Sequence, residues 1–236
     1  MEWTLEGVGR FWDGVADYDD VNQETYSYFR RFTDGYRLCS IADHSYILDI
    51  CSRTGNGSLF FFQRGKVRAA VCADVSENML ETCHQRLQET GVDFSLMKFS
   101  SYPLPLPDNE FDAVLCFETL EHLPQPGRFL QELHRVLKSN GELLLTTPNS
   151  LWEPAHWLAA ILAVHHSEGP HKFLSKRRAV RLFKKAGFRI AREDTTVLIP
   201  AGPASLTALG EFLERAAGKW VRSLLGLRRI FICKKI

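Results

Sequence analysis

Residues 46–57, YILDICSRTGNG, decide which fold the chain can adopt. A short apolar run ends near Asp49, and small residues then lead to Gly55. A strand that passes through such a turn into a helix is typical of a nucleotide-binding loop in an α/β protein. Two positions at which such a loop would carry glycine hold Cys51 and Arg53 instead. Whether this is a working cofactor loop depends on the strands and acids downstream of it.

Strand-like and helix-like segments alternate from residue 46 onward. The pattern predicts strands at 46–50, 69–75, 92–99, 111–117, 141–149, 188–199 and 227–236. It predicts helices at 57–65, 77–90, 126–137 and 175–187, two of them opened by the N-cap residues Ser76 and Ser175. Such alternation favours parallel strands joined by crossover helices, in one open, doubly wound sheet.

Two segments lie outside this alternation. Residues 1–45 are aromatic-rich and helix-compatible, whereas residues 46–236 form the predicted α/β domain. We expect residues 1–45 to form a flap across the carboxyl edge of the sheet in that domain. Residues 151–171 insert an apolar helix that is too short to span a membrane. Two interpretations of the insert stay open: a lid packed on the core, or a segment (151–164) that contacts a bilayer peripherally.

The composition excludes several classes of protein. The 236 residues carry a net charge of +1, so no nucleic-acid partner is expected. Six cysteines are scattered without a CxxC pair, which favours reduced thiols and a cytoplasmic protein. A content of 45% hydrophobic and 24% charged residues is that of an ordinary globular protein.

The acids that end the first two strands are candidate ligand-binding residues. In an open parallel sheet, ligands bind beyond the carboxyl ends of the strands. Asp49 ends the first strand and Asp74 ends the second. An acid at the second position can accept both ribose hydroxyls of an adenosine, although a helix N-cap is an equally good interpretation of such an aspartate.

Four blocks in order resemble the class I S-adenosylmethionine-dependent methyltransferases. They are ILDICSRTGNG, VCADVSENML, LPLPDNEFDAVLCFETLEHLPQP and GELLLTTPN. The resemblance implies a Rossmann-like, mostly parallel seven-stranded sheet with helices on both faces and an antiparallel last strand. It also implies S-adenosylmethionine as the cofactor, bound by Asp49, Cys51, Ser52, Arg53, Gly55, Asp74, Val75, Met79, Ser100, Ser101 and Phe117.

Three residues depart from the family pattern. The first loop of the family usually reads LDxGxGxG, and Cys51 and Arg53 stand where its first two glycines would be. Glycine permits a positive φ and lets backbone approach a ligand closely. Ser100 replaces an acid that often lies near the adenine. The alternative is therefore a non-catalytic or differently catalytic protein with a degenerate cofactor loop.

The block ETLEHLP suggests a metal site. In a helical conformation Glu118, Glu121 and His122 would share one face. The spacing alone favours a plainer interpretation, in which they are a cofactor contact, a solvated helix acid and a lone packing or base residue. The block also resembles ubiquinone-biosynthesis O-methyltransferases and small-RNA 2′-O-methyltransferases. The resemblance to the small-RNA enzymes implies a Mg, Mn or Zn site formed by Glu118, Glu121, His122 and His171, in which His165 or His166 could replace His171.

The resemblance as a whole implies an enzyme. We expect an S-adenosylmethionine-dependent methyltransferase that O-methylates a small apolar or aromatic hydroxylated substrate, with assistance from the metal. Glu118 and His122 are the expected catalytic residues. Without a metal, His122 is the expected general base, because the attacking hydroxyl must lose its proton.

Overall fold

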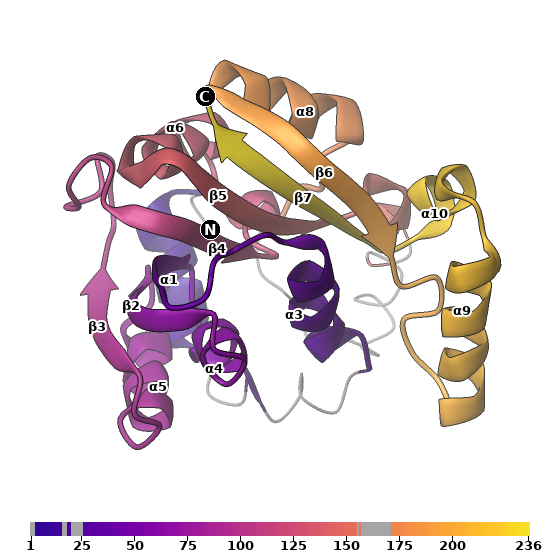
Figure 1. The fold of residues 1–236 in the computed structure, drawn as a ribbon, viewed down its shortest axis with the longest axis horizontal. Coiled ribbons are helices and arrows are strands. Elements are labelled where there is room, and N and C mark those ends of the chain that lie inside the picture. The colour runs from indigo at the N-terminus through magenta and orange to yellow at the C-terminus, as the bar shows by residue number, and fades with distance from the viewer. Residues whose placement is uncertain (1–2, 16–17, 20–25, 155, 157–170) are drawn as a thin grey trace.

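The structure, a computed structural model, describes residues 3–15, 18–19, 26–154, 156 and 171–236. They contain one seven-stranded sheet in the order β3-β2-β1-β4-β5-β7-β6 (Figure 1). The strands are β1 (Ser45–Ile50), β2 (Val67–Asp74), β3 (Asp93–Lys98), β4 (Phe111–Phe117), β5 (Leu137–Pro148), β6 (Phe188–Thr196) and β7 (Arg228–Lys235). The strands from β3 to β5 are parallel, whereas β7 runs antiparallel to β5 and β6. The predicted Rossmann-like sheet with an antiparallel last strand is confirmed.

Helices cover both faces of this sheet (Figure 1). They are α1 (Leu5–Asp13), α3 (Tyr26–Leu38), α4 (Asn56–Phe62), α5 (Glu77–Leu87), α6 (Pro126–Val136), α8 (Lys176–Lys185), α9 (Ala204–Ala216), α10 (Lys219–Leu225) and the 3-10 helices η1 (Leu120–His122) and η2 (Ser150–Trp152). Side chains of α3, α4 and α5 pack in one core cluster, and those of α1, α6 and α8 pack in the other. Burial on both faces explains why β1 and β4 are apolar along nearly their whole length.

Local sequence signals set several helix ends as predicted. Ser76 Oγ accepts the backbone N–H of Met79 at 3.2 Å and caps α5. Ser175 Oγ accepts the N–H of Arg178 at 3.3 Å and caps α8. Gly187 follows α8 with φ +93°, a conformation that glycine adopts without steric cost.

Two segments differ from the prediction. The strand expected at 188–199 ends at Thr196, and α9 and α10 come after it, although the sequence pattern did not predict them. The helical face expected at 118–122 does not form, because Glu118 has φ +48° and only the short helix η1 comes after it.

Both segments outside the alternation are only partly described. Of the expected flap, α1 and α3 are described, and α3 contacts α4 and the strands β5, β6 and β7. Of the expected insert, residues 155 and 157–170 lie outside the described residues, so the apolar helix predicted there is not addressed. No helix in the described ranges is both long enough and apolar enough to cross a membrane.

Candidate active site

Two loops meet at the carboxyl edge of the sheet, where the strand order reverses. Strand β1 lies between β2 and β4, so the crossover after β1 leads to one side of it and the chain after β3 returns to its other side. The loop after β1 contains residues 51–55, and the turn after β4 contains Glu118 and Thr119. A crevice between such strands is the usual ligand site of an open α/β sheet.

The loop after β1 keeps the backbone of a glycine loop without its first two glycines. Cys51, Arg53 and Gly55 have φ of +52°, +50° and +79°. For a residue with a side chain, the left-handed region costs roughly 1–2 kcal/mol. A Cβ on Gly55 would lie 2.7 Å from the Sγ of Cys83, so glycine is also required there by close packing. The loop is therefore strained but has the shape that the predicted loop needs.

Asp49, near the end of β1, holds the helix that comes after the loop. Its Oδ2 accepts the backbone N–H of Ser58 at 2.9 Å and the Ser58 hydroxyl at 2.8 Å. Burial raises the pKa of Asp49 to about 6, and the two hydrogen bonds oppose that rise. Asp49 therefore ties β1 to the first turn of α4 in this structure, which is a positioning role.

Asp74, at the end of β2, holds the loop after β1 and the start of α5 in place. Its Oδ2 accepts the N–H of Arg53 at 2.8 Å, and its Oδ1 accepts the N–H of Ser76 at 3.0 Å. Its residue exposure is only 3%. Burial raises the pKa of Asp74, while the backbone hydrogen bonds of Ser76 and Arg53 oppose the rise. This acid connects the loop to α5 and presents a carboxylate to the crevice.

The side chain of Arg53 fills the centre of the crevice. Its Nη1 donates to the carbonyl oxygen of Phe117 at 3.1 Å, and its Nη2 donates to that of Glu118 at 2.6 Å. Its guanidinium also lies 5.4 Å from the ring centroids of both Trp12 and Tyr18. Arg53 therefore joins the glycine-type loop, the end of β4 and the N-terminal residues.

Little space is left around Arg53. The cavity that remains measures about 20 Å³ and is lined by Val8, Trp12, Cys51, Arg53, Asp74, Val75, Thr119, His122 and Leu123. That volume is about enough for one water molecule. The carboxylate of Asp74 and the two carbonyl oxygens suit a cationic ligand with hydroxyl groups. The residues therefore fit S-adenosylmethionine in chemistry, and in space only if the Arg53 side chain moves.

Helix α1 covers the crevice on the side formed by Val75 and His122. Trp12 packs edge-on against the ring of His122 at 5.7 Å, and the indole of Trp3 donates to the His122 carbonyl at 2.8 Å. A Cβ on Gly9 would lie 2.6 Å from the carbonyl oxygen of Val75. Only glycine allows this close approach, so the sequence of α1 is adapted to this position.

The acids of the ETLEHLP block have different partners. Glu118 Oε1 accepts from Arg228 Nε at 3.0 Å. Burial works against its charge, but Arg228 and Arg31 outweigh burial and lower the pKa of Glu118. Glu121 is 2% exposed and accepts the hydroxyl of Thr147 at 3.0 Å. Burial and the charge of Glu118 raise the pKa of Glu121 to about 8.

The described residues give no support for the predicted metal site. Among the residues that the structure describes, no three His, Cys, Asp or Glu side chains lie close enough together to hold one ion. Glu118 pairs with Arg228 and Glu121 accepts the hydroxyl of Thr147, while the rings of His122 and His171 are 6.2 Å apart. The substitutes suggested for His171, residues 165 and 166, lie outside the described residues. The donor set does not fit a divalent cation, and we derive no step through one.

The other predicted cofactor residues lie at different depths. Ser52 and Met79 are buried, and Val75 lines the small cavity. Ser100 and Ser101 are exposed at the end of β3. The ring of Phe117 packs 4.9 Å from Phe32 in the core, so only its carbonyl faces the crevice.

Sequence reasoning missed the aromatic residues that cover the site. Trp12 and Tyr18 contact Arg53, and Tyr18 also packs against Trp12 at 5.7 Å. The aromatic content of residues 1–45 was the available signal. It could not tell which rings face the loop, because those contacts span more than 30 positions of sequence.

Comparison with known proteins finds similar sequences over part of the chain. Residues 48–145 match the family model described as a methyltransferase domain. The ubiquinone/menaquinone biosynthesis C-methyltransferase UbiE of Paraburkholderia phymatum is 33% identical over 157 residues, which cover 65% of this chain and 65% of that protein. The chain thus spans just under two thirds of the length of the curated relatives it matches.

Solved structures share the fold. A chain from the complex between the Haloferax volcanii Trm112 methyltransferase activator and a putative methyltransferase has a TM-score of 0.72 at 16% identity, covering 96% of both chains. The [4+2]-cyclase SpnF has a TM-score of 0.67 at 19% identity, covering 98% of this chain and 97% of that one. Residues 48–145 therefore resemble a methyltransferase domain, and the sheet order is the one expected for the class I S-adenosylmethionine-dependent methyltransferases. Over part of its length the chain is similar to a ubiquinone-biosynthesis methyltransferase.

Proposed function

We propose that the chain transfers a methyl group from S-adenosylmethionine to a small, apolar, hydroxylated acceptor such as a phenol. The observation that supports this most strongly is the left-handed backbone retained at Cys51, Arg53 and Gly55, beside a buried acid at the end of β2. A loop that had lost its ligand would be free to relax its strain. Retaining strain at a binding crevice is typical of a functional site.

We propose that the cofactor takes the place of the Arg53 side chain. The positively charged ammonium of its methionine portion would donate to the carbonyl oxygens of Phe117 and Glu118, which now accept from the guanidinium. Asp74 would accept the ribose hydroxyls, and the exposed residues Ser100 and Ser101 would lie nearest the adenine. Cys51, Ser52 and Gly55 would provide loop backbone. When bound, S-adenosylmethionine supplies an electrophilic methyl group on a sulfonium.

The N-terminal residues are proposed to act as a flap over this site. Trp12 and Tyr18 lie on the Arg53 guanidinium, and Asp19 pairs with Arg86 of α5. Asp19 also accepts the hydroxyl of Thr54 in the loop at 2.9 Å. Cofactor entry would then require this polar latch to open, and closure would exclude water from the methyl group.

His122 is the proposed general base. It is 6% exposed and lines the small cavity together with the apolar residues Val8, Trp12 and Leu123. An imidazole there could take the proton of an acceptor hydroxyl, and the apolar lining favours an apolar acceptor. Removing a phenol proton puts negative charge on the oxygen and on the adjacent ring carbons, so the same base serves O- and C-methylation. The matched relatives carry a C-methyltransferase name.

A methyl-transfer assay tests this proposal. The protein, supplied with S-adenosylmethionine and a panel of alkyl-substituted phenols, should produce S-adenosylhomocysteine only when a phenol is present. Mass spectrometry of the product would show whether the methyl group is on oxygen or carbon. Absence of turnover across the panel, with cofactor binding intact, would refute the acceptor class.

A second candidate function follows from the small space that Arg53 leaves for a cofactor. A protein on this fold could catalyse another reaction or none, and the solved structure titled as a [4+2]-cyclase shares the fold. Calorimetry with S-adenosylmethionine separates the two functions. Binding by the wild type supports the methyltransferase, whereas binding by Arg53→Gly alone, or no heat from either variant, supports the second function.

A further inference from the structure

Helix α9 exposes its apolar side and buries its polar side. Its buried residues are Thr207, Gly210 and Glu214. Its exposed residues include Leu206, Leu209, Phe212 and Leu213. A helix on the surface of a soluble domain normally has the opposite arrangement, with apolar residues facing the core.

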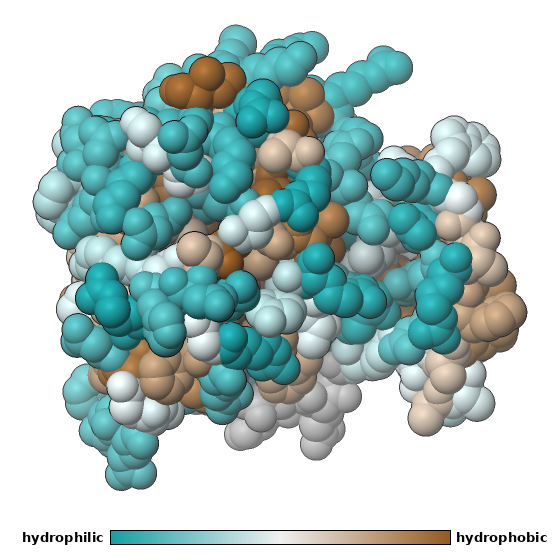
Figure 2. Space-filling model, in the orientation of Figure 1, coloured by the Kyte–Doolittle hydropathy of each residue, from teal (hydrophilic) through white to brown (hydrophobic). Residues whose placement is uncertain are grey.

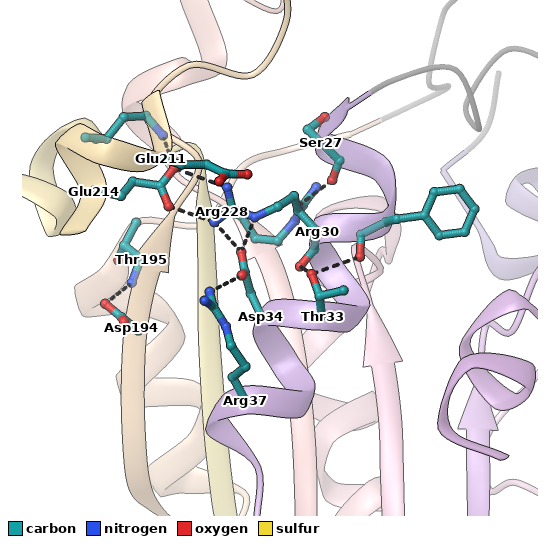
Figure 3. A network of polar contacts seen from close by, with 12 residues as sticks. Ser27, Arg30, Thr33, Asp34, Arg37, Asp194, Thr195, Glu211, Glu214 and Arg228 are labelled. Carbon is teal, nitrogen blue, oxygen red and sulfur yellow. Dashed lines mark hydrogen bonds and ion pairs between the residues drawn. The ribbon is translucent and has the colours of Figure 1, made fainter. Parts of the chain in front are cut away.

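Polar contacts hold this inverted helix to the domain. Glu214 Oε2 pairs with Arg30 of α3 at 2.7 Å, and Glu214 Oε1 accepts the N–H of Leu198 at 3.0 Å. Glu211 accepts the hydroxyl of Tyr26 at 2.7 Å. Figure 3 shows Glu211 and Glu214 turned toward Arg30 and Asp34 of α3. Both acids of α9 are therefore used inward, which fixes its apolar side outward.

Helix α10 continues the same surface. It buries no residue, and the side chains of Trp220, Leu224 and Leu225 are exposed, Trp220 by 77%. Arg222 turns inward and donates to Asp194 at 3.1 Å, whereas Lys219 at the start of the helix is exposed. One charged residue of α10 thus faces the protein, and its large apolar residues face outward.

These residues form one apolar patch, the α9–α10 surface. Its members are Leu206, Leu209, Phe212, Leu213, Trp220, Leu224 and Leu225. They are seven of the eleven large hydrophobic side chains that are exposed among the described residues. Hydrophobic colouring gathers over α9 in the space-filling view (Figure 2). Large exposed apolar side chains gathered on two successive helices mark an interaction site.

The patch continues toward the insert. The indole of Trp152 in η2 donates to the carbonyl of Leu225 at 2.9 Å. The neighbouring Leu151 is 57% exposed. The surface therefore reaches the point at which the 151–171 insert begins.

The charges at the border of the patch are basic. The side chain of Arg215 is 72% exposed, and Lys219 is also exposed. Glu214 is buried, and Glu211 is hydrogen-bonded to Tyr26 but keeps its side chain 42% exposed and lies 4.0 Å from Arg215. The two exposed cations outnumber this partly exposed acid, so the net outward charge next to the apolar residues is positive, which complements an anionic partner.

We propose that the α9–α10 surface docks the protein on an anionic lipid membrane. Helices of 13 and 7 residues are too short to cross a bilayer but suit a position in the plane of the interface. Leucine, phenylalanine and tryptophan would enter the acyl boundary, and Arg215 and Lys219 would meet the lipid phosphates. This inference does not depend on the proposed methyl transfer.

Vesicle co-sedimentation tests the proposal. The full chain should bind phosphatidylcholine vesicles that contain phosphatidylglycerol and should bind pure phosphatidylcholine less. The double variant Phe212→Glu/Trp220→Glu should lower the partition coefficient about tenfold or more, since two large apolar side chains no longer enter the lipid. The double variant Arg215→Glu/Lys219→Glu should lose the preference for phosphatidylglycerol. Ile236→Glu is the matched control, because Ile236 is 83% exposed but lies outside the patch, and its binding should not change.

Two further measurements keep the test decisive. Circular dichroism should show that both double variants fold, because the four replaced side chains face solvent. Brominated lipids should quench a fluorescence signal that Trp220→Phe removes. Unchanged binding by Phe212→Glu/Trp220→Glu would overturn the proposal. So would light scattering that shows a wild-type dimer, dissociated by the same variant, without any vesicle binding.

Discussion

Replacing Arg53 by glycine should tighten cofactor binding. In the structure the guanidinium occupies the crevice between the loop after β1 and the end of β4, and it leaves a cavity of about 20 Å³. A cofactor that binds there must first displace this side chain from its two carbonyl partners. Arg53→Gly removes the side chain and keeps the left-handed φ of +50° accessible without strain.

The magnitude comes from the contacts that the cofactor would otherwise have to break. Hydrogen bonds from a charged group contribute about 1.5–3 kcal/mol each, and exposure of the guanidinium from beneath Trp12 and Tyr18 adds to this. Displacing Arg53 should therefore cost at least about 3 kcal/mol, which corresponds to roughly 100-fold in the dissociation constant. Stability should fall by less, because relief of the left-handed conformation returns about 1–2 kcal/mol.

Isothermal titration with S-adenosylmethionine measures the effect directly. Arg64→Gly is the matched control, since Arg64 also donates to a backbone carbonyl, that of Phe60 at 3.0 Å, and lies over an aromatic ring. Arg64 lies outside the crevice, so its replacement should leave the dissociation constant unchanged. Weaker or equal binding by Arg53→Gly would refute the reasoning and would mean that the arginine assists the cofactor.

Other changes should separate the roles of the remaining site residues. Asp74→Ala should weaken S-adenosylmethionine by about 1–3 kcal/mol in the same titration, because buried ribose hydroxyls would lose their acceptor; full affinity would place the cofactor elsewhere. His122→Gln should lower kcat by about 100-fold or more while the cofactor affinity stays the same, and an unaltered kcat would exclude it as the base. Chelators should leave the methyl-transfer rate unchanged, since Glu118 is paired with Arg228; loss of activity restored by one metal would contradict this. Burial and the charge of Glu118 raise the pKa of Glu121 from 4.5 to about 8 in the folded protein. Between these two pH values the unfolded chain has lost the Glu121 proton and the folded protein still binds it. The free energy of unfolding should therefore fall by about 1.4 kcal/mol per pH unit as the pH rises through this range. Chemical denaturation of Glu121→Gln should show a shallower fall than that of the wild type, and identical pH profiles would show that the glutamate titrates normally.

The sequence by itself determined the sheet and most of its connections. Alternation of apolar strands with capped helices is local information, and Ser76 and Ser175 cap the helices they were expected to begin. The four ordered blocks indicated the class of domain, because its loops are short and come directly after strands. It also located the glycine-type loop and the acid Asp74, which lie together at the carboxyl edge.

Only the tertiary structure decided what these side chains do. The spacing of Glu118, Glu121 and His122 predicted one helical face, but a left-handed turn at Glu118 separates them. Glu118 pairs with Arg228, 110 positions away along the chain. Arg53 likewise points into the crevice because carbonyls at the end of β4, 64 and 65 positions away, accept from it.

The same limit applies to α9 and α10. Leucine and phenylalanine on a helix usually indicate a buried side, and nothing in the local pattern shows that Glu214 would be the buried residue instead. Its burial depends on Arg30, which lies 184 positions earlier. Periodicity specifies which residues share a face of a helix, whereas partners distant in sequence decide which face turns toward the protein.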